Sequence, residues 1–440
     1  MCMKRSFSII LFITFSLFAQ EKQTPTISGW GWLTMGQIKS SELIPSPGTL
    51  VDLAEQPIGD LQAGIKLTQP LRSSTVCKLH LMTSFVIPVT KLSVGSAIYS
   101  AEQLQKSFSI SLLEASLLNN TKIAENDTLT TEFGYFPVKY NPEAMNLGEY
   151  LFRSNAYPPL LISGFEIADK VKLAGVHTGY RKHGSAGTFK ADMFVNTETE
   201  NYPTMDISLS YLIGYTTPKP FFDFSSGISF FHMIPFDRNR TTPPDSRTYQ
   251  ALTMFVDSVT HDTTRYTFKG TKVAARATID FKYLFNSEVF GKNDLKLYAE
   301  SAILGLKDYP GWYNNITERM PIMAGFNIPT FKLLDVLAAE VEYYPMPYQN
   351  SYHLLWKSSS PVPDFNLYAG KDYYSDWKPK TDDDWKWSFY ASKKIKNIRI
   401  SGQIASDHSS RATYLIYKTY TEMVPRTKDW YYLLRCSFFF

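Results

Sequence analysis

Polar and apolar residues alternate along much of this chain, and the alternation is clearest between positions 271 and 285. In "TKVAARATIDFKYLF" every second residue from Val273 to Tyr283 is apolar, and the intervening positions carry the charges. Successive side chains of a strand point to opposite faces, so this segment is predicted to be a β-strand with one apolar and one charged face.

The same period of two recurs along the whole chain. It appears in "LTTEFGYF", "TFKADMFVN", "DISLSYLIGYT", "LKLYAES", "VLAAEVEYY", "WKWSFYAS" and "NIRISGQIAS". Further strands are expected over 27–37, 59–68, 76–86, 108–118, 170–180, 221–234 and 320–328. The total is about 16, within a range of about 14 to 18. No Pro/Gly/Ser-rich linker or change in composition divides them, so we expect one closed all-β sheet, an antiparallel barrel without exposed edges.

The last residues, "DWYYLLRCSFFF", follow the same rule. One face is apolar or amphipathic, whereas the other is mixed and contains Arg435. This asymmetry is typical of a strand between lipid and a polar lumen, although the final strand of a soluble sandwich would also alternate. The apolar face comprises Trp430, Tyr432, Leu434, Cys436, Phe438 and Phe440.

The amino-terminal residues favour the membrane alternative. "MCMKRSFSIILFITFSLFAQEKQ" places Lys4 and Arg5 before an uncharged apolar run, Phe7 to Phe18, which is followed by the small residue Ala19. This order is that of a secretory signal peptide, and the run is too short for a permanent spanning helix. We therefore expect residues 1–19 to be removed and residues 20–440 to form an exported barrel.

Composition agrees with a transmembrane barrel. Aromatic residues make up 15% of the chain, yet the mean hydropathy is only −0.20. Aromatic girdles combined with a polar lumen and polar loops produce this pairing. The net charge of +4 falls to +2 without Lys4 and Arg5, which is too small to indicate a nucleic-acid partner.

Connections of two lengths are expected, as in barrels with short periplasmic turns and long extracellular loops. The short candidates are 182–187, 216–220, 393–397 and 286–293. The long candidates are 39–57, 141–165, 236–265 and 345–384.

Charged residues on the polar face of the predicted strands are candidates for lining the lumen. A charge on such a strand is tolerated where water or a counter-charge solvates it. Both signs occur, so strong ion selectivity is not indicated, and pairing across the wall as structural salt links is the alternative role. The candidates are Lys190, Asp192, Lys272, Arg276, Asp280, Lys282, Lys296, Glu300, Glu340, Glu342, Arg399, Gln403 and Arg435.

The loop 141–165 contains a helix-prone piece, "EAMNLGEYLFR". It carries Glu143, Glu149 and Arg153 beside apolar residues. Such a loop can fold inward and narrow the lumen, with its charges towards a passing solute. Packing over the outer rim is the alternative.

Catalytic, metal and cofactor sites have little support in the sequence. The seven histidines show no metal-ligand spacing, and no phosphate-binding or dinucleotide fingerprint is present. "SDHSS" at 406–410 brings an acid, a base and hydroxyls together, but adjacent residues on a turn do not form a triad. Cys77 and Cys436 each fall on an apolar face, where cysteine acts as a small hydrophobe. We expect no enzyme activity and no cofactor.

These features together resemble those of bacterial outer-membrane β-barrel proteins. The closing strand, Tyr432, Leu434, Cys436, Phe438 and Phe440, resembles the signal read by the barrel-assembly machinery, with Cys436 a mild departure. In "TEFGYFPVKYN", Gly134, Phe136, Pro137 and Tyr140 resemble a strand end of phosphate- and polyphosphate-type porins, but that family's basic ladder for anions is not evident.

The resemblance implies a porin-like channel in the outer membrane that passes small hydrophilic solutes. Its partners would be lipid, the assembly machinery and its solutes, and a homo-oligomer is compatible with it. The second hypothesis is a barrel that anchors an adhesin, in which the aromatic loop 368–385 binds carbohydrate or a partner.

Overall fold

The computed structural model describes residues 24–42, 54–86, 92–94, 97–99, 108–144, 171–197, 205–236, 254–256, 259–265, 269–285, 288–307, 315–345, 382–409 and 423–440. The expected signal peptide, 1–19, lies outside these residues. Among them, no helix has the length and apolar character needed to cross a bilayer.

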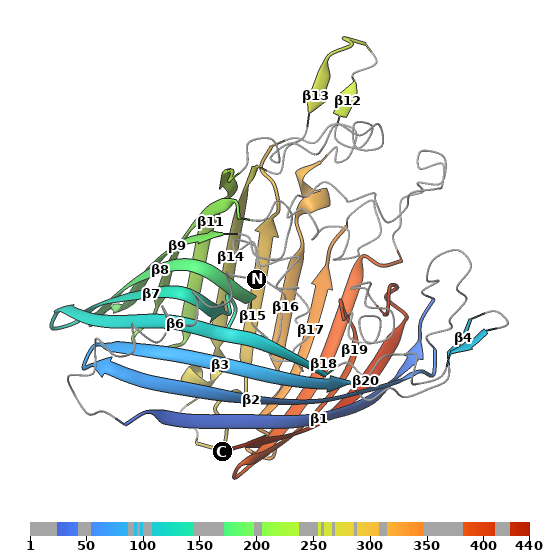
Figure 1. Ribbon diagram of the computed structural model, residues 1–440, viewed down its shortest axis with the longest axis horizontal. Helices are drawn as coiled ribbons and strands as arrows, with labels where there is room; N and C mark the ends of the chain where they lie inside the picture. The colour runs from blue at the N-terminus through green and yellow to red at the C-terminus, as the bar shows by residue number, and fades with distance from the viewer. Residues whose placement is uncertain are drawn as a thin grey trace, which may run out of the picture.

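Sixteen strands form one closed antiparallel barrel, in which each strand pairs with its neighbours in chain order and β20 pairs with β1 (Figure 1). The predicted fold class, a closed antiparallel all-β barrel of about 16 strands, is therefore confirmed. Its strands are β1 (Thr26–Ser40), β2 (Pro57–Arg72), β3 (Thr75–Val86), β6 (Phe108–Ala124), β7 (Asp127–Val138), β8 (Val171–Gly184), β9 (Gly187–Thr197), β10 (Ile207–Thr216), β11 (Phe222–Ile234), β14 (Gly270–Asp280), β15 (Lys296–Ile303), β16 (Ile322–Asn327), β17 (Val336–Tyr343), β18 (Trp385–Ile395), β19 (Ile398–Ser406) and β20 (Trp430–Phe439).

Short and long connections alternate around the barrel. Short turns at 73–74, 125–126, 185–186, 217–221 and 396–397 lie at the end where β1 begins and β20 ends. The long connections lie at the other end, as predicted; three of them, 87–107, 304–321 and 407–429, were not among the predicted loops. Two small sheets, β4 (Leu92–Val94) with β5 (Ala97–Tyr99) and β12 (Met254–Val256) with β13 (Thr263–Arg265), belong to long connections, and β12–β13 projects from the barrel (Figure 1).

The barrel closes where β20 meets β1. The backbones of Gly29 and Phe440 exchange two hydrogen bonds, of 2.8 and 2.9 Å. A Cβ at Gly36 would lie 2.0 Å from the carbonyl oxygen of Tyr432, so only glycine allows the strands to approach this closely. Leu434, Phe438 and Phe440 are exposed, whereas Arg435 is buried, which confirms the predicted faces of the last strand.

The wall has its polar face inside and its apolar face outside. On β14, Lys272, Arg276 and Asp280 are buried, whereas Val273 and Ile279 alternate with them on the more accessible face. Elsewhere, large apolar residues such as Ile65 and Ile213 are exposed. The sheet forms a single layer, so buried side chains point into the barrel. This arrangement reverses that of a water-soluble fold.

One predicted strand is too long. The segment from 271 to 285 was expected to be extended throughout, but β14 ends at Asp280 and the 3-10 helix η2 (Phe281–Leu284) follows. The Asp280 side chain accepts a hydrogen bond of 3.2 Å from the backbone N–H of Lys282, which caps this turn. A residue with a short polar side chain therefore ends the strand, although the alternation of the sequence continues.

Inward aromatic rings lie over glycines of the neighbouring strand. Tyr298 of β15 is opposite Gly325 of β16, and its hydroxyl donates to Glu340 of β17 at 2.7 Å. Trp30 of β1 is likewise opposite Gly64 of β2, and its indole N–H donates to His80 of β3 at 3.0 Å. In both cases the glycine gives the ring room to reach the third strand.

Replacing Gly325 with alanine is expected to destabilise the barrel by about 1–3 kcal/mol, as overpacking does in well-packed interiors. The new Cβ would lie 2.3 Å from the Tyr298 ring, which is fully buried and cannot move aside freely. Gly31→Ala is the matched control because the nearest atom to its Cβ would be 3.6 Å away. Urea unfolding of both variants measures the difference, and equal stabilities would contradict this account.

Candidate functional site

Most of the charged residues predicted to line the lumen lie on the inner face of a strand. Glu340 and Glu342 are inward on β17, and the structure buries both. Lys282 does not lie on a strand: it lies on η2, where it pairs with Asp280 at 3.0 Å. Arg399 has the inward parity of β19, opposite buried Ser437, but it is exposed near the start of the strand, above the Phe439 ring. The other inward positions are Lys190 and Asp192 on β9, Lys272, Arg276 and Asp280 on β14, Lys296 and Glu300 on β15, Gln403 on β19 and Arg435 on β20.

Ion pairs connect the inner faces of β2, β3, β6 and β7. Glu114 of β6 accepts from Lys66 of β2 at 2.7 Å and lies 3.3 Å from Lys78 of β3. Lys78 also pairs with Glu132 of β7 at 3.0 Å. Cations and carboxylates therefore alternate along this chain of ion pairs, in the order Lys66, Glu114, Lys78 and Glu132.

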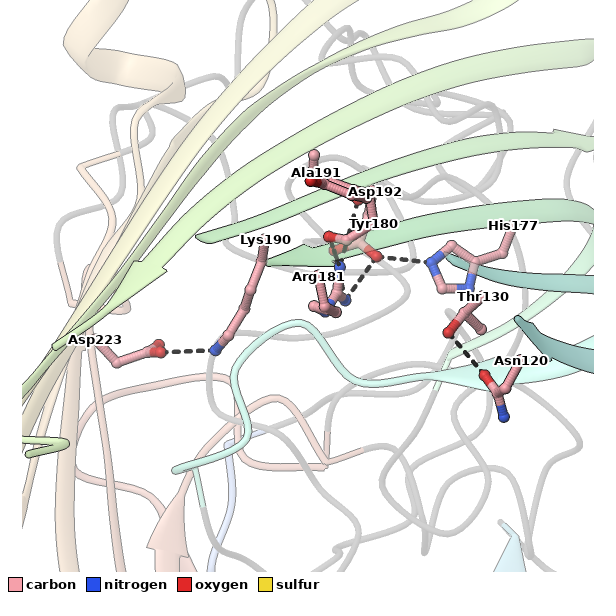
Figure 2. Close-up of polar contacts among 9 residues, drawn as sticks. All are labelled: Asn120, Thr130, His177, Tyr180, Arg181, Lys190, Ala191, Asp192 and Asp223. Atoms are coloured by element: carbon pink, nitrogen blue, oxygen red, sulfur yellow. Dashed lines mark hydrogen bonds and ion pairs between the residues drawn. The ribbon is translucent and has the colours of Figure 1, made fainter. Parts of the chain in front are cut away.

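The alternation continues across β8 and β9 (Figure 2). Asp192 is held at 2.8 Å by His177 Nε2 and at 2.7 and 2.9 Å by Arg181 Nη2. The His177 ring also stacks on Phe194, with a centroid separation of 4.4 Å. Both oxygens of the Asp192 carboxylate are thus fixed against the wall.

A third cluster links β9 to β11 and β14. Lys190 Nζ reaches over β10 to Asp223 Oδ2 at 2.9 Å (Figure 2), and Arg276 Nη1 lies 2.8 Å from Asp223 Oδ1. We call the three clusters together the charge belt. It consists of Lys66, Lys78, Glu114, Glu132, His177, Arg181, Lys190, Asp192, Asp223 and Arg276.

The described start of the long connection after β7 crosses to other strands of the wall. Tyr140 donates to the Ser225 carbonyl of β11 at 3.3 Å, and its ring lies under the Arg276 guanidinium at 5.7 Å. Glu143 accepts a 2.7 Å bond from Lys296 of β15. These contacts bring residues 139–144 onto the inner faces of β11, β14 and β15 rather than over the rim.

Tyr140 acts as a neutral group in these contacts. Burial, together with the negative charge of Glu300, raises the pKa of its hydroxyl well above the usual value. The hydroxyl therefore keeps its proton and donates at any physiological pH. Of the other predicted constriction residues, Glu149 and Arg153 lie outside the described residues.

Polar clusters at the long-loop ends of β17 and β19 are built from the residues around His408. The ring of His408 lies 2.8 Å from Glu342, and both side chains are fully buried. Asp407 instead accepts from Tyr431 at 2.8 Å and from Gln403 at 3.0 Å. In these contacts His408 bonds Glu342 and Asp407 bonds Tyr431 and Gln403, which is not the arrangement of a catalytic triad.

The acidic, histidine and cysteine side chains are dispersed along the described strands. Within the part of the chain that the structure describes, no three His, Cys, Asp or Glu residues are grouped to hold a metal ion. Cys77 and Cys436 are free and half-buried. Most of the aromatic loop 368–385 lies outside the described residues.

Several members of the charge belt were not predicted. Lys66, Lys78 and Asp223 each lie between two apolar neighbours, which is the signal that identified the other candidates, whereas Glu132, His177 and Arg181 each have only one. Glu114 departs from strict alternation because the register of β3 with β6 shifts there, so that Leu113 and Glu114 are both buried. Such a β-bulge changes the face on which later residues lie.

The chain has only a distant likeness to the proteins with which it was compared. No protein-family model matches the chain, and no curated protein matches it. Among solved structures, a triple mutant of the Rhodopseudomonas blastica porin covers 95% of this chain and 100% of its own, at 8% identity and a TM-score of 0.45. A double mutant of the same porin gives the same coverage at 9% identity and a TM-score of 0.45. A likeness at this level carries no argument about function, and the barrel is defined by its own strand pairing.

Proposed function

We propose that this chain is a porin-like channel that spans a bacterial outer membrane and lets small hydrophilic solutes pass. The observation that carries this proposal is the reversal of polarity across a closed barrel, with charges inside and large apolar side chains outside. Closure pairs the backbone groups of every strand, which a bilayer requires because it offers them no water.

The strand lengths support the same proposal. β9, β14 and β18 each contain 11 residues, and β10 and β20 contain 10. A tilted strand of about 9–11 residues crosses the hydrocarbon core of a bilayer. These five strands are therefore long enough to cross the hydrocarbon core, whereas β15, β16 and β17 are shorter, with 8, 6 and 8 residues.

The route to the membrane and the narrowing of the lumen belong to this proposal. Residues 1–19 would direct export, and Tyr432, Leu434, Cys436, Phe438 and Phe440 would present the assembly signal to the barrel-assembly machinery. Residues 139–144, held by Tyr140 and Glu143, would restrict the lumen. The anchor and adhesin hypothesis has no support from the described residues.

Planar-bilayer recording of the refolded protein tests the proposal. A sample that shifts on a gel after boiling first establishes that the barrel has folded. We expect stepwise conductance that rises with salt concentration, because water and ions fill the lumen. A folded, membrane-inserted barrel that conducts no ions would contradict the channel.

A further inference from the structure

Cations and carboxylates of the charge belt are exposed to different extents. The Lys66 side chain is 35% exposed and its partner Glu114 is 2% exposed. Arg181 is 30% exposed against 13% for Asp192, and Lys190 is 32% exposed against 19% for Asp223. In each of these three pairs, solvent reaches the cation more than the carboxylate. The belt pair Arg276 and Asp223 has the opposite order, at 9% and 19%.

The contacts of these pairs also leave the cations more open to a solute than the carboxylates. Both oxygens of Glu114, of Asp192 and of Asp223 contact a basic side chain of the wall. An ammonium group has three N–H donors. Within the described part of the chain, the Nζ atoms of Lys66 and Lys190 each donate to a single carboxylate. The belt therefore keeps open donors, while these three carboxylates are occupied.

The exposed part of the belt lies on one side of the barrel. Lys66, Arg181 and Lys190 belong to β2, β8 and β9. On the inner faces of β14, β17 and β18, Lys272, Glu342 and Lys386 are buried. Lys296 of β15 is 15% exposed, and Arg399 near the start of β19 is exposed; both are basic. Among the described residues, the charged surface that a solute in the lumen meets is therefore basic, although the wall as a whole is close to neutral.

We propose that this surface makes the passage prefer small anions that carry carboxylate or phosphate groups over cations of similar size. The ammonium groups of Lys66 and Lys190 bind the anion, because each donates to only one carboxylate of the wall. Arg181 adds positive charge beside them, since its Nη1 and Nη2 groups already donate to the Tyr180 and Ala191 carbonyls and to Asp192. Rings of basic side chains select anions in pores by this electrostatic means. The inference rests on the proposed channel function and adds the class of solute to it.

Reversal potentials of the wild-type channel in a potassium chloride gradient show whether it selects anions or cations. We expect chloride to be more permeant than potassium, and sodium acetate and sodium phosphate gradients to give the same sign. A channel that conducts but favours potassium would overturn this inference and leave the channel function intact. A folded barrel without conductance would overturn both.

The triple variant Lys66→Gln, Arg181→Gln and Lys190→Gln tests the assignment to these residues. We expect its chloride-to-potassium permeability ratio to fall by about twofold or more, because the exposed donors lose their charge. The charge-keeping variant Lys66→Arg, Arg181→Lys and Lys190→Arg should retain the wild-type ratio. If both variants keep the ratio, the belt does not select the solute.

A second control tests whether the permeability ratio depends on the position of the belt residues or only on the net charge of the protein. Lys219, Lys332 and Lys396 are exposed at the short-turn end of the barrel, so replacing all three with glutamine removes the same charge elsewhere. We expect little change in the permeability ratio. If the belt variant fails to fold, Lys66→Cys modified with a negatively charged thiol reagent gives the same comparison on a folded channel. A fall in the ratio upon modification supports the inference, and an unchanged ratio contradicts it.

Discussion

Replacing Ile65 with arginine is expected to lower the free energy of unfolding from a bilayer by about 2–4 kcal/mol, the cost of a cation on the lipid face near the membrane midplane. Ile65 lies in the middle of β2, and it is 57% exposed on the outer face. Lipid offers the guanidinium neither water nor a counter-charge. Urea unfolding of the protein in lipid vesicles measures the change.

Two controls isolate the effect of the charge. Ile65→Leu keeps the surface apolar and should change the stability by less than about 1.5 kcal/mol. Thr130→Arg places the same charge on the inner face of β7, where Thr130 bonds Asn120 at 2.8 Å (Figure 2), and it should cost much less than the outward arginine. Equal losses for the inward and outward arginines would contradict a lipid-facing outer wall.

Replacing Tyr140 and Glu143 together with alanine is expected to raise the single-channel conductance by about twofold, because a loop that narrows a pore limits its current. The double variant removes the hydrogen bond to Ser225, the ring under Arg276 and the ion pair with Lys296. Residues 139–144 then lose their side-chain contacts with β11, β14 and β15. Planar-bilayer recording measures the conductance.

The matched control is Tyr140→Phe with Glu143→Gln. Phenylalanine keeps the ring beneath Arg276, and glutamine still accepts a hydrogen bond from Lys296, so the segment should stay in place. We expect a conductance close to that of the wild type. An alanine variant that conducts no more than this control would show that residues 139–144 do not restrict the passage.

Much of the fold follows from the sequence because its determinant is local. Alternation over a single segment assigns the two faces of a strand, and segments such as 188–196 and 206–216 agree closely with β9 and β10. The predicted strand runs past the end of β14 because the cap is a hydrogen bond from the Lys282 backbone N–H to the Asp280 side chain, which leaves the hydrophobic pattern unchanged. Patterning reports which face is apolar, whereas strand ends depend on single hydrogen bonds.

For the candidate site, the sequence predicts only which side chains lie on the inner face of the wall. The alternation of polar and apolar residues placed Lys190, Asp192 and Arg276 on the inner wall. Their partners, however, depend on strand register and on contacts across strands. The bond between Glu143 and Lys296 joins residues 153 positions apart, and no local pattern encodes it. The bulge before Glu114 likewise reverses a face that simple alternation assigns. These contacts require the closed barrel itself.

Along each strand, every second side chain is expected to face lipid, and the side chains between them are expected to face the water of the lumen. Nitroxide labels placed one at a time from Phe189 to Val195 along β9, in protein reconstituted into vesicles, test it most directly. We expect oxygen, which dissolves in lipid, to relax most strongly the labels at the outward positions Phe189, Ala191, Met193 and Val195. A water-soluble nickel complex should instead relax those at Lys190, Asp192 and Phe194. Labels that all contact water equally, without a period of two, would contradict it.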